Sequence, residues 1–186
     1  MTDTLDLDTL HLDKGSHRDR DTGVCLLEAV AWFAGKKHTD YPLCVSPILG
    51  AYGRNLNDAL PDDKRQQLKP FIPRLVGTAE DGHDQIRGLM AADWVIRTYT
   101  PTWLRLAGLQ AEAVSLETLP RQTSWDDVEA AVPILRAAGQ KTYAAWAARD
   151  AAQDAARDAL RPTLDVLQDS AIDLYDRMIS AASDDG

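Results

Sequence analysis

The 186-residue sequence has only two cysteines, Cys25 and Cys44, and lacks any apolar run near the roughly 18 residues of a membrane-spanning helix. Its first 21 residues are mostly polar and lack the positively charged stretch and apolar core of a secretory signal. Two cysteines without such a signal are typical of a reduced protein, so no disulfide is expected. We therefore predict a soluble, cytoplasmic protein that has no membrane partner.

Positive charge is also scarce, because 20 lysines and arginines stand against 29 aspartates and glutamates. The formal net charge of -9 and the isoelectric point near 4.8 argue against sequence-independent binding of nucleic acid, which needs a basic surface. The acidity fits a solvated surface, a basic protein partner or mimicry of DNA. A solvated surface is the simplest of these interpretations, and no nucleic acid is expected as a partner.

A strand-rich region, a glycine-rich phosphate loop and a nucleophile elbow are all missing, whereas segments with helical periodicity recur. We predict an all-α fold: a helical bundle around a central apolar helix at about residues 23–34, with a long Ala-rich C-terminal helical hairpin or arm. The expected parts are a polar N-terminal arm at 1–21, a helical core at 22–120 and the Ala-rich arm at 121–182. That arm would pack on the core or on a partner.

The predicted central helix is almost free of charge, since Glu28 is the only charged residue between Gly23 and Gly35. Asp21 or Thr22 is expected to cap its N-terminus, and Gly35 to end it. A helix that is apolar all round is buried all round. A carboxylate within it must be paired, ligated or protonated, because an unpaired buried charge is very costly.

Two interpretations of Glu28 stay open. The first pairs it with an arginine such as Arg18, Arg54 or Arg74, and the number of arginines in the chain favours this one. The second makes Glu28 a metal ligand or a general base.

Chemistry at this helix would centre on Cys25, Glu28, His38 and Cys44. With Thr22 as the cap, Cys25 is the third helical residue, where free amides favour a thiolate, and His17, His38 or His83 would serve as its base. Two sulfurs, an imidazole and a carboxylate are also suitable ligands for zinc, although their spacing matches no standard zinc module. The competing interpretation is that Cys25 is a small buried apolar residue, as free cysteines usually are.

Ser46 followed by Pro47 predicts the start of a second helix, which extends to about Leu60. Gly50 and Gly53 weaken this helix, but their missing side chains would let a neighbouring helix approach closely.

The same helix carries a dense polar cluster, formed by Arg54, Asn55, Asn57 and Asp58. Such a cluster either lines a pocket for a small molecule or forms a solvated helix face.

The C-terminal third is rich in alanine. Ser124 is expected to cap a helix there, and Gly139 to end or bend it. The tandem repeat "AARD", "AAQD", "AARD" follows over Ala147–Asp158 and predicts continuous helix. Beyond it, apolar residues alternate at spacings of four and three, a seam that suits pairing with another helix of this chain, with a protein partner or with a second copy. The seam residues are Leu160, Leu164, Leu167, Ala171, Leu174, Met178 and Ala181.

Three blocks, "GVCLLEAVAWFAG", "NDALPDDKRQQLKPFIPRLVGT" and "LRPTLDVLQDSAIDLYDRMI", flank or precede the repeat. Together with the repeat they resemble a group of uncharacterised proteins from bacteria, often actinobacteria, and their phages. The resemblance implies a bacterial or phage origin, and it assigns no activity or ligand. We expect a non-enzymatic helical interaction or regulatory protein; the alternative is a small thiol- or metal-dependent enzyme centred on Cys25.

Overall fold

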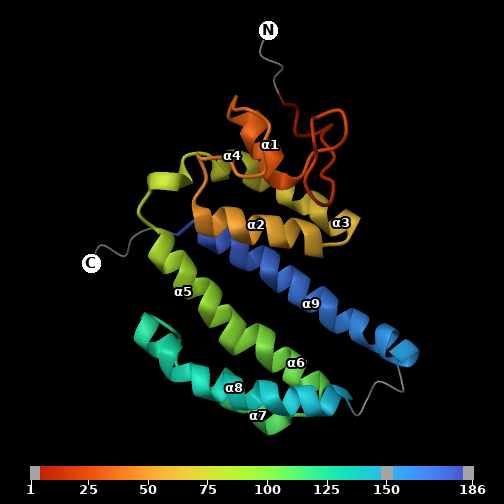
Figure 1. The fold of residues 1–186 in the computed structure, drawn as a ribbon, viewed down its shortest axis with the longest axis vertical. Helices are drawn as coiled ribbons and strands as arrows, with labels where there is room; N and C mark the ends of the chain where they lie inside the picture. The colour runs from red at the N-terminus through yellow and green to blue at the C-terminus, as the bar shows by residue number, and fades with distance from the viewer. Residues whose placement is uncertain (1–4, 148–152, 182–186) are drawn as a thin grey trace. The chain divides into compact units, whose positions relative to one another are not determined.

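The computed structural model describes residues 5–147 and 153–181 (Figure 1). It confirms the all-α prediction, since these residues form helices and no strand. The elements are α1 (Leu26–Phe33), α2 (Pro47–Ala59), α3 (Asp62–Arg65), the 3-10 helix η1 (Gln66–Phe71), α4 (Ile72–Leu75), the 3-10 helix η2 (Thr78–Glu80), α5 (Asp84–Trp94), the π-helix η3 (Val95–Tyr99), α6 (Thr100–Leu106), α7 (Gln110–Glu117), α8 (Trp125–Ala147) and α9 (Gln153–Ile179).

The chain divides into two compact units. Unit 1 comprises residues 1–87 and 171–186, and unit 2 comprises residues 88–170. This division differs from the one expected at residues 21 and 120. Both boundaries fall inside continuous helices, α5 and α9, so no helix end marks the change of unit.

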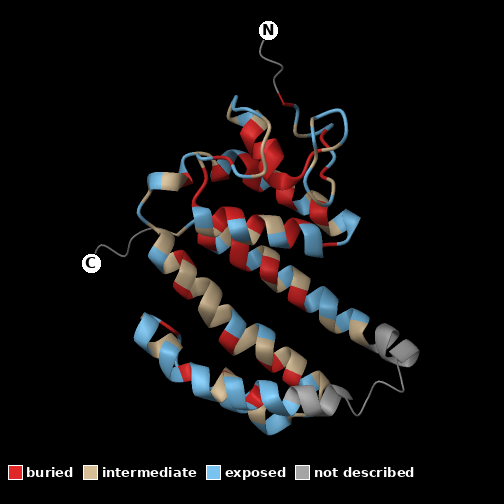
Figure 2. Cartoon of the chain, viewed as in Figure 1, coloured by how far each residue is buried: buried red, intermediate tan, exposed pale blue. Residues whose placement is uncertain are grey.

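In unit 1, α1 packs against α2 and α4. Its residues from Leu26 to Ala31 are all buried, as the red ribbon of α1 in Figure 2 shows, whereas Phe33 near its end is 45% exposed. The expected cap at Asp21 or Thr22 is wrong. Cys25 is the N-cap instead, because Gly23 has a φ of +137°, a backbone conformation that no helix contains. The predicted end is confirmed by Gly35, which has a φ of +64°.

Helix α2 begins as expected. The hydroxyl of Ser46 accepts a hydrogen bond from the Leu49 amide at 3.2 Å, and Pro47 occupies the first helical position. Gly53 faces α9, where a Cβ atom would lie only 3.0 Å from Tyr175 Cζ. The close approach predicted for the two glycines is therefore confirmed at Gly53 and absent at Gly50, where a Cβ atom would make only an ordinary contact, 3.5 Å from Arg54 Nη1.

The end of α9 belongs to unit 1 and forms part of its core. Leu174, Tyr175 and Met178 are 1% exposed or less. The Tyr175 ring stacks on Tyr52, with 5.4 Å between the centroids. The guanidinium of the fully buried Arg87 donates from Nε to the Met178 carbonyl at 3.0 Å, which anchors α9 to α5 within this unit.

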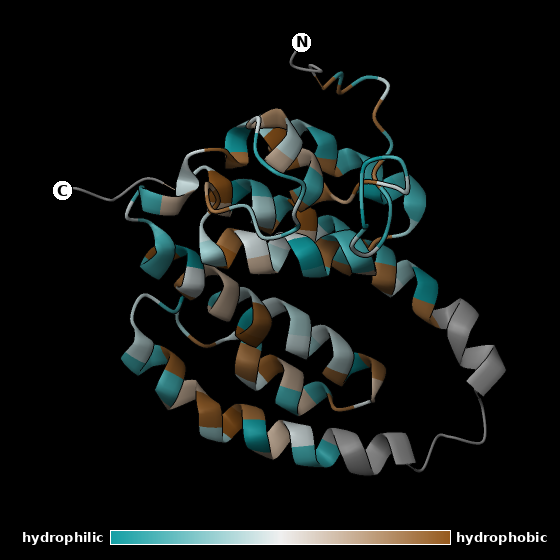
Figure 3. Cartoon of the chain, turned by 45° about the horizontal axis from the view of Figure 1, so that its top comes forward, coloured by the Kyte–Doolittle hydropathy of each residue, from teal (hydrophilic) through white to brown (hydrophobic). Residues whose placement is uncertain are grey.

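Unit 2 has its own core. In this unit α6 packs against α7, and α7 against α8. The buried residues of the core are Ile96, Leu104, Ala113, Leu116, Ala131 and Ala138. Hydrophobic and hydrophilic residues alternate along α8 and along the described part of α9, as Figure 3 shows. This amphipathic pattern is typical of helices that are buried on one face.

Ser124 caps α8 as predicted, since its hydroxyl accepts from the Asp127 amide at 3.2 Å. The end or bend expected at Gly139 is wrong as an end, because α8 continues to Ala147. The centre of the alanine repeat, residues 148–152, lies outside the described residues. Within the parts of the chain that the structure describes, we find no helix whose length and apolarity would suffice to traverse a lipid bilayer.

Candidate functional site

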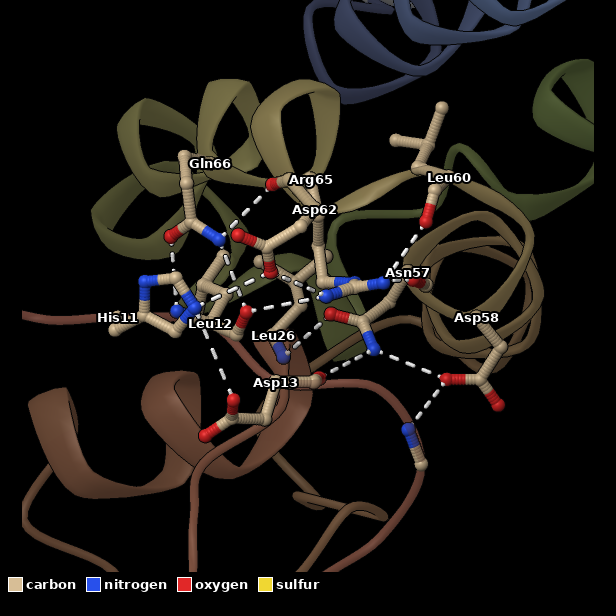
Figure 4. Close-up of polar contacts among 11 residues, drawn as sticks. His11, Leu12, Asp13, Leu26, Asn57, Asp58, Leu60, Asp62, Arg65 and Gln66 are labelled. Carbon is tan, nitrogen blue, oxygen red and sulfur yellow. Dashed lines mark hydrogen bonds and ion pairs between the residues drawn. The ribbon is translucent and has the colours of Figure 1, made fainter.

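The N-terminal segment, residues 5–24, is fastened to unit 1 by side chains that bind its backbone (Figure 4). Gln66 accepts from the Leu12 amide at 2.9 Å through Oε1 and donates to the Leu12 carbonyl at 3.0 Å through Nε2. The Leu12 side chain is fully buried. Although this segment is mostly polar, as expected, buried leucines such as Leu12 hold it against the helices.

Asn57 links this segment to two helices at once. Its Oδ1 accepts from the Leu26 amide at 3.2 Å, one of the free amides at the start of α1. Its Nδ2 donates to the Asp13 carbonyl and to Asp58 Oδ1, both at 3.0 Å. Asp58 Oδ1 also accepts from the Gly15 amide at 2.8 Å. Figure 4 shows these contacts converging at the end of α2.

Arg65 closes the same network from the other side. Its buried guanidinium donates to the carbonyls of Asn57 and Leu60, each at 2.8 Å, and to the carboxylate of Asp62 at 3.0 Å. The two carbonyls belong to the last turn of α2, where acceptors lack helical partners and a positive charge is favoured.

Glu28 is 1% exposed, and its partners are histidines and backbone amides. It accepts from the His17 amide at 2.6 Å, from His17 Nδ1 at 2.8 Å and from the Cys25 amide at 2.8 Å. His38 Nε2 lies 3.5 Å from Glu28 Oε1. The expected pairing with an arginine is wrong, because the loops on either side of α1 bring His17 and His38 to the carboxylate first.

Burial by itself would raise the pKa of Glu28, but the hydrogen bonds from the amides of Cys25 and His17 and from the His17 ring lower it below its ordinary value. The carboxylate is therefore charged at neutral pH. Because the charged Glu28 carboxylate can only accept a hydrogen bond, His17 Nδ1 must carry the proton that is donated to it. Glu28 also lies three residues after the N-cap Cys25, where the helix dipole favours its negative charge.

His38 is held by the N-terminal segment. Its Nε2 donates to the His17 carbonyl at 3.0 Å, while its buried Nδ1 has no hydrogen-bond partner among the described residues. His17 packs beneath Gly23, where a Cβ atom would lie 2.6 Å from His17 Nε2. Only glycine fits there. The role of His17 as the partner of Glu28 was missed by the sequence interpretation, which considered it as a base for Cys25.

Cys25 does not have the environment of a nucleophile. Its side chain is 3% exposed, and burial raises the pKa of the thiol to about 12, so that it is protonated at neutral pH. It stands at the N-cap and not at the third helical position. Cys44 is half-buried, and both cysteines are free thiols.

The predicted zinc ligands Cys25, Glu28, His38 and Cys44 do not form a metal centre. In the described part of the chain, no group of three or more His, Cys, Asp or Glu side chains is placed to hold a metal ion. Glu28 is occupied by hydrogen bonds to backbone amides and to His17 instead.

A cavity of about 260 Å³ opens in unit 1 beside this cluster. Its wall comes from the N-terminal segment, the loop after α1 and helix α2, together with Cys25 at the start of α1. The residues that α2 contributes are Arg54, Asn55, Asn57 and Asp58. The predicted polar cluster thus lines a pocket, although Asn55 and Asp58 within it are also exposed to solvent.

The seam on α9 is shared between the two units. Leu174 and Met178 are buried in unit 1, and Leu167 is 5% exposed in unit 2. These three residues pack within their own chain, which is the first of the alternatives left open for the seam, and they are not exposed to a partner. Leu160 is half-buried and Leu164 is 38% exposed.

Comparison of the chain with family models, with curated proteins and with solved structures finds no match.

Proposed function

We propose that unit 1 is a binding module for a small polar molecule. The observation that supports this proposal is the cavity of about 260 Å³, whose lining residues include an arginine, two aspartates and two asparagines. Pockets that recognise small molecules commonly place a few polar groups from separate segments around one space. Here Asn57 holds the N-terminal segment through the Asp13 carbonyl and Arg54 holds the loop after α1 through the Asp40 carbonyl, so the segments of the wall are tied together before a ligand arrives.

The test is a screen of small polar metabolites by thermal shift and ligand-observed NMR. Asn55→Trp would fill the cavity from an exposed position on α2 without touching the buried network. The matched control is Ala51→Trp, which adds the same side chain one turn earlier, at an exposed residue outside the cavity wall. Binding that Asn55→Trp abolishes and Ala51→Trp retains supports the proposal. Binding that both variants retain, or no binding at all, contradicts it.

A second proposal keeps the expected non-enzymatic interaction or regulatory role, now centred on the part of α9 in unit 2. Leu160 and Leu164 support it, because they lie one turn apart on the helix and are half-buried and 38% exposed. Light scattering should then detect a dimer or a captured partner, and Leu160→Asp with Leu164→Asp should abolish the association without unfolding. A monomer that captures no partner would contradict this role.

The alternative of a thiol- or metal-dependent enzyme centred on Cys25 is not proposed, since the thiol is buried and protonated and no group of three or more metal-binding side chains is found among the described residues. The bacterial or phage origin stays a proposal that rests on the resemblance of the three sequence blocks and the repeat. A cytoplasmic location likewise stays a proposal, supported by the two free cysteines.

A further inference from the structure

The cavity in unit 1 carries charges of both signs. Arg54 and Asp58 come from neighbouring turns of α2, and Asp40 comes from the loop after α1. Among the ion pairs of the described residues, none joins the Arg54 guanidinium to either carboxylate. Arg54 and the two aspartates therefore line one space, with no direct ion pair between them among the described residues.

The contacts of Arg54 fix its position and leave its charge available. Its Nη1 donates to the main-chain carbonyl of Asp40 at 2.9 Å, and its guanidinium stacks on the Tyr41 ring at 3.7 Å. Neither partner is anionic. The Nε and Nη2 hydrogens remain as donors, in the planar arrangement that suits a carboxylate.

Asp58 is held in a complementary way. Both hydrogen bonds that it accepts from the described residues, from the Gly15 amide and from Asn57 Nδ2, reach the same oxygen, Oδ1. Its Oδ2 accepts none from these residues and is left as an acceptor for a cationic group. Asp40 adds a second carboxylate to the wall, at a half-buried position.

We infer that the cavity takes a small zwitterion, a molecule that carries one ammonium and one carboxylate, such as a free amino acid. This inference rests on the proposed binding function. A ligand that displaces water from both wall charges but supplies only one opposite charge leaves the other charge without a partner, which is unfavourable. At about 30 Å³ for each water, the volume of about 260 Å³ holds roughly nine waters, or a solute of about that many non-hydrogen atoms.

The experiment is calorimetric titration of the full chain with α-amino acids and with ω-amino acids, in which only the number of methylenes between ammonium and carboxylate changes. The controls are the amine and the carboxylic acid with the same carbon skeleton. We expect at least one amino acid to bind. We also expect each single-charge control to bind about tenfold more weakly, the loss that corresponds to one charge-assisted hydrogen bond.

Substitutions at two residues assign the charges. Arg54→Gln should weaken the amino acid by about tenfold and leave the amine unchanged, while Arg54→Lys keeps part of the affinity because the positive charge stays. Asp58→Asn retains the Oδ1 acceptor for Gly15, and it should weaken the amino acid and the amine while leaving the carboxylic acid unchanged. Circular dichroism of each variant confirms the fold before titration.

Several results overturn the inference. If the single-charge controls bind as tightly as the amino acid, or if Arg54→Gln and Asp58→Asn change nothing, the ligand is not recognised as a zwitterion. If only uncharged molecules bind and Asn55→Trp blocks them, the zwitterion inference fails while the proposed binding function stands. If no molecule of the metabolite screen or of the titration series binds, both fail.

Discussion

Helix α9 crosses α2 at Gly53, and we predict that Gly53→Ala destabilises unit 1. The new methyl group would lie 3.0 Å from Tyr175 Cζ and 3.2 Å from Leu27 Cδ2, with the Tyr175 hydroxyl closer still. Tyr175 is fully buried between Tyr52 and Phe71, so its ring has no free space to enter. The methyl therefore has to displace α9 or force the ring from its place.

The expected magnitude is a balance of three effects. Alanine is favoured over glycine inside a helix by about 1 kcal/mol. Overpacking a full core costs about 1–3 kcal/mol. Displacing the ring also weakens the hydrogen bond from the Tyr175 hydroxyl to the Leu49 carbonyl, 3.1 Å long, which contributes about 1 kcal/mol. Gly53→Ala should thus lower the free energy of unfolding by about 2 kcal/mol.

The assay is equilibrium urea denaturation followed by far-UV circular dichroism. Gly50→Ala is the matched control on the same helix. Its methyl would meet Arg54 Nη1 at 3.5 Å, an ordinary contact, so this variant should be neutral or up to about 1 kcal/mol more stable. Combining Gly53→Ala with Tyr175→Phe removes the hydroxyl that faces the methyl, and we expect a favourable coupling of about 1 kcal/mol. Equal stabilities of the two alanine variants would refute the close packing of α2 against α9.

Further predictions concern the buried charge, the N-terminal segment and the seam. Glu28→Gln should lower the free energy of unfolding, measured by urea denaturation at neutral pH, by about 3 kcal/mol, because charge-assisted hydrogen bonds from buried donors are lost. A decrease of less than about 1 kcal/mol would contradict this prediction. The pKa of Glu28 is lowered from its ordinary value of 4.5 in the folded chain. The carboxylate's contribution to stability is therefore complete above pH 4.5 and declines as the pH falls through the folded pKa. Glu28→Gln should lack this decline. Asn57→Ala should release the N-terminal segment, seen as faster tryptic cleavage at Lys14, whereas an unchanged rate would count against the clamp. Leu174→Asp should unfold unit 1, whereas Leu164→Asp should leave the circular dichroism spectrum unchanged. A larger loss of helix signal in Leu164→Asp than in Leu174→Asp would argue against the packing of α9.

Local signals in the sequence identified several features correctly. Ser46, Ser124 and Gly35 mark helix ends, because a cap depends on residues only two or three positions away. The cluster around Arg54 could be located for a similar reason, since residues one turn apart on α2 share a face whatever the rest of the fold does. The missing side chains of Gly50 and Gly53 showed where a helix could approach closely, but only Gly53 is approached.

The tertiary structure alone decided which groups meet. Glu28 was recognisable as a buried charge in need of a partner, but its partner is His17, which the path of the N-terminal segment delivers, and not an arginine. The helix begins after Cys25, later than predicted, because the positive φ of Gly23 turns the chain just before α1. The seam is regular along α9, yet Leu174 and Met178 are buried in unit 1. Periodicity shows that a face is apolar, and only the arrangement of the other helices decides what covers it.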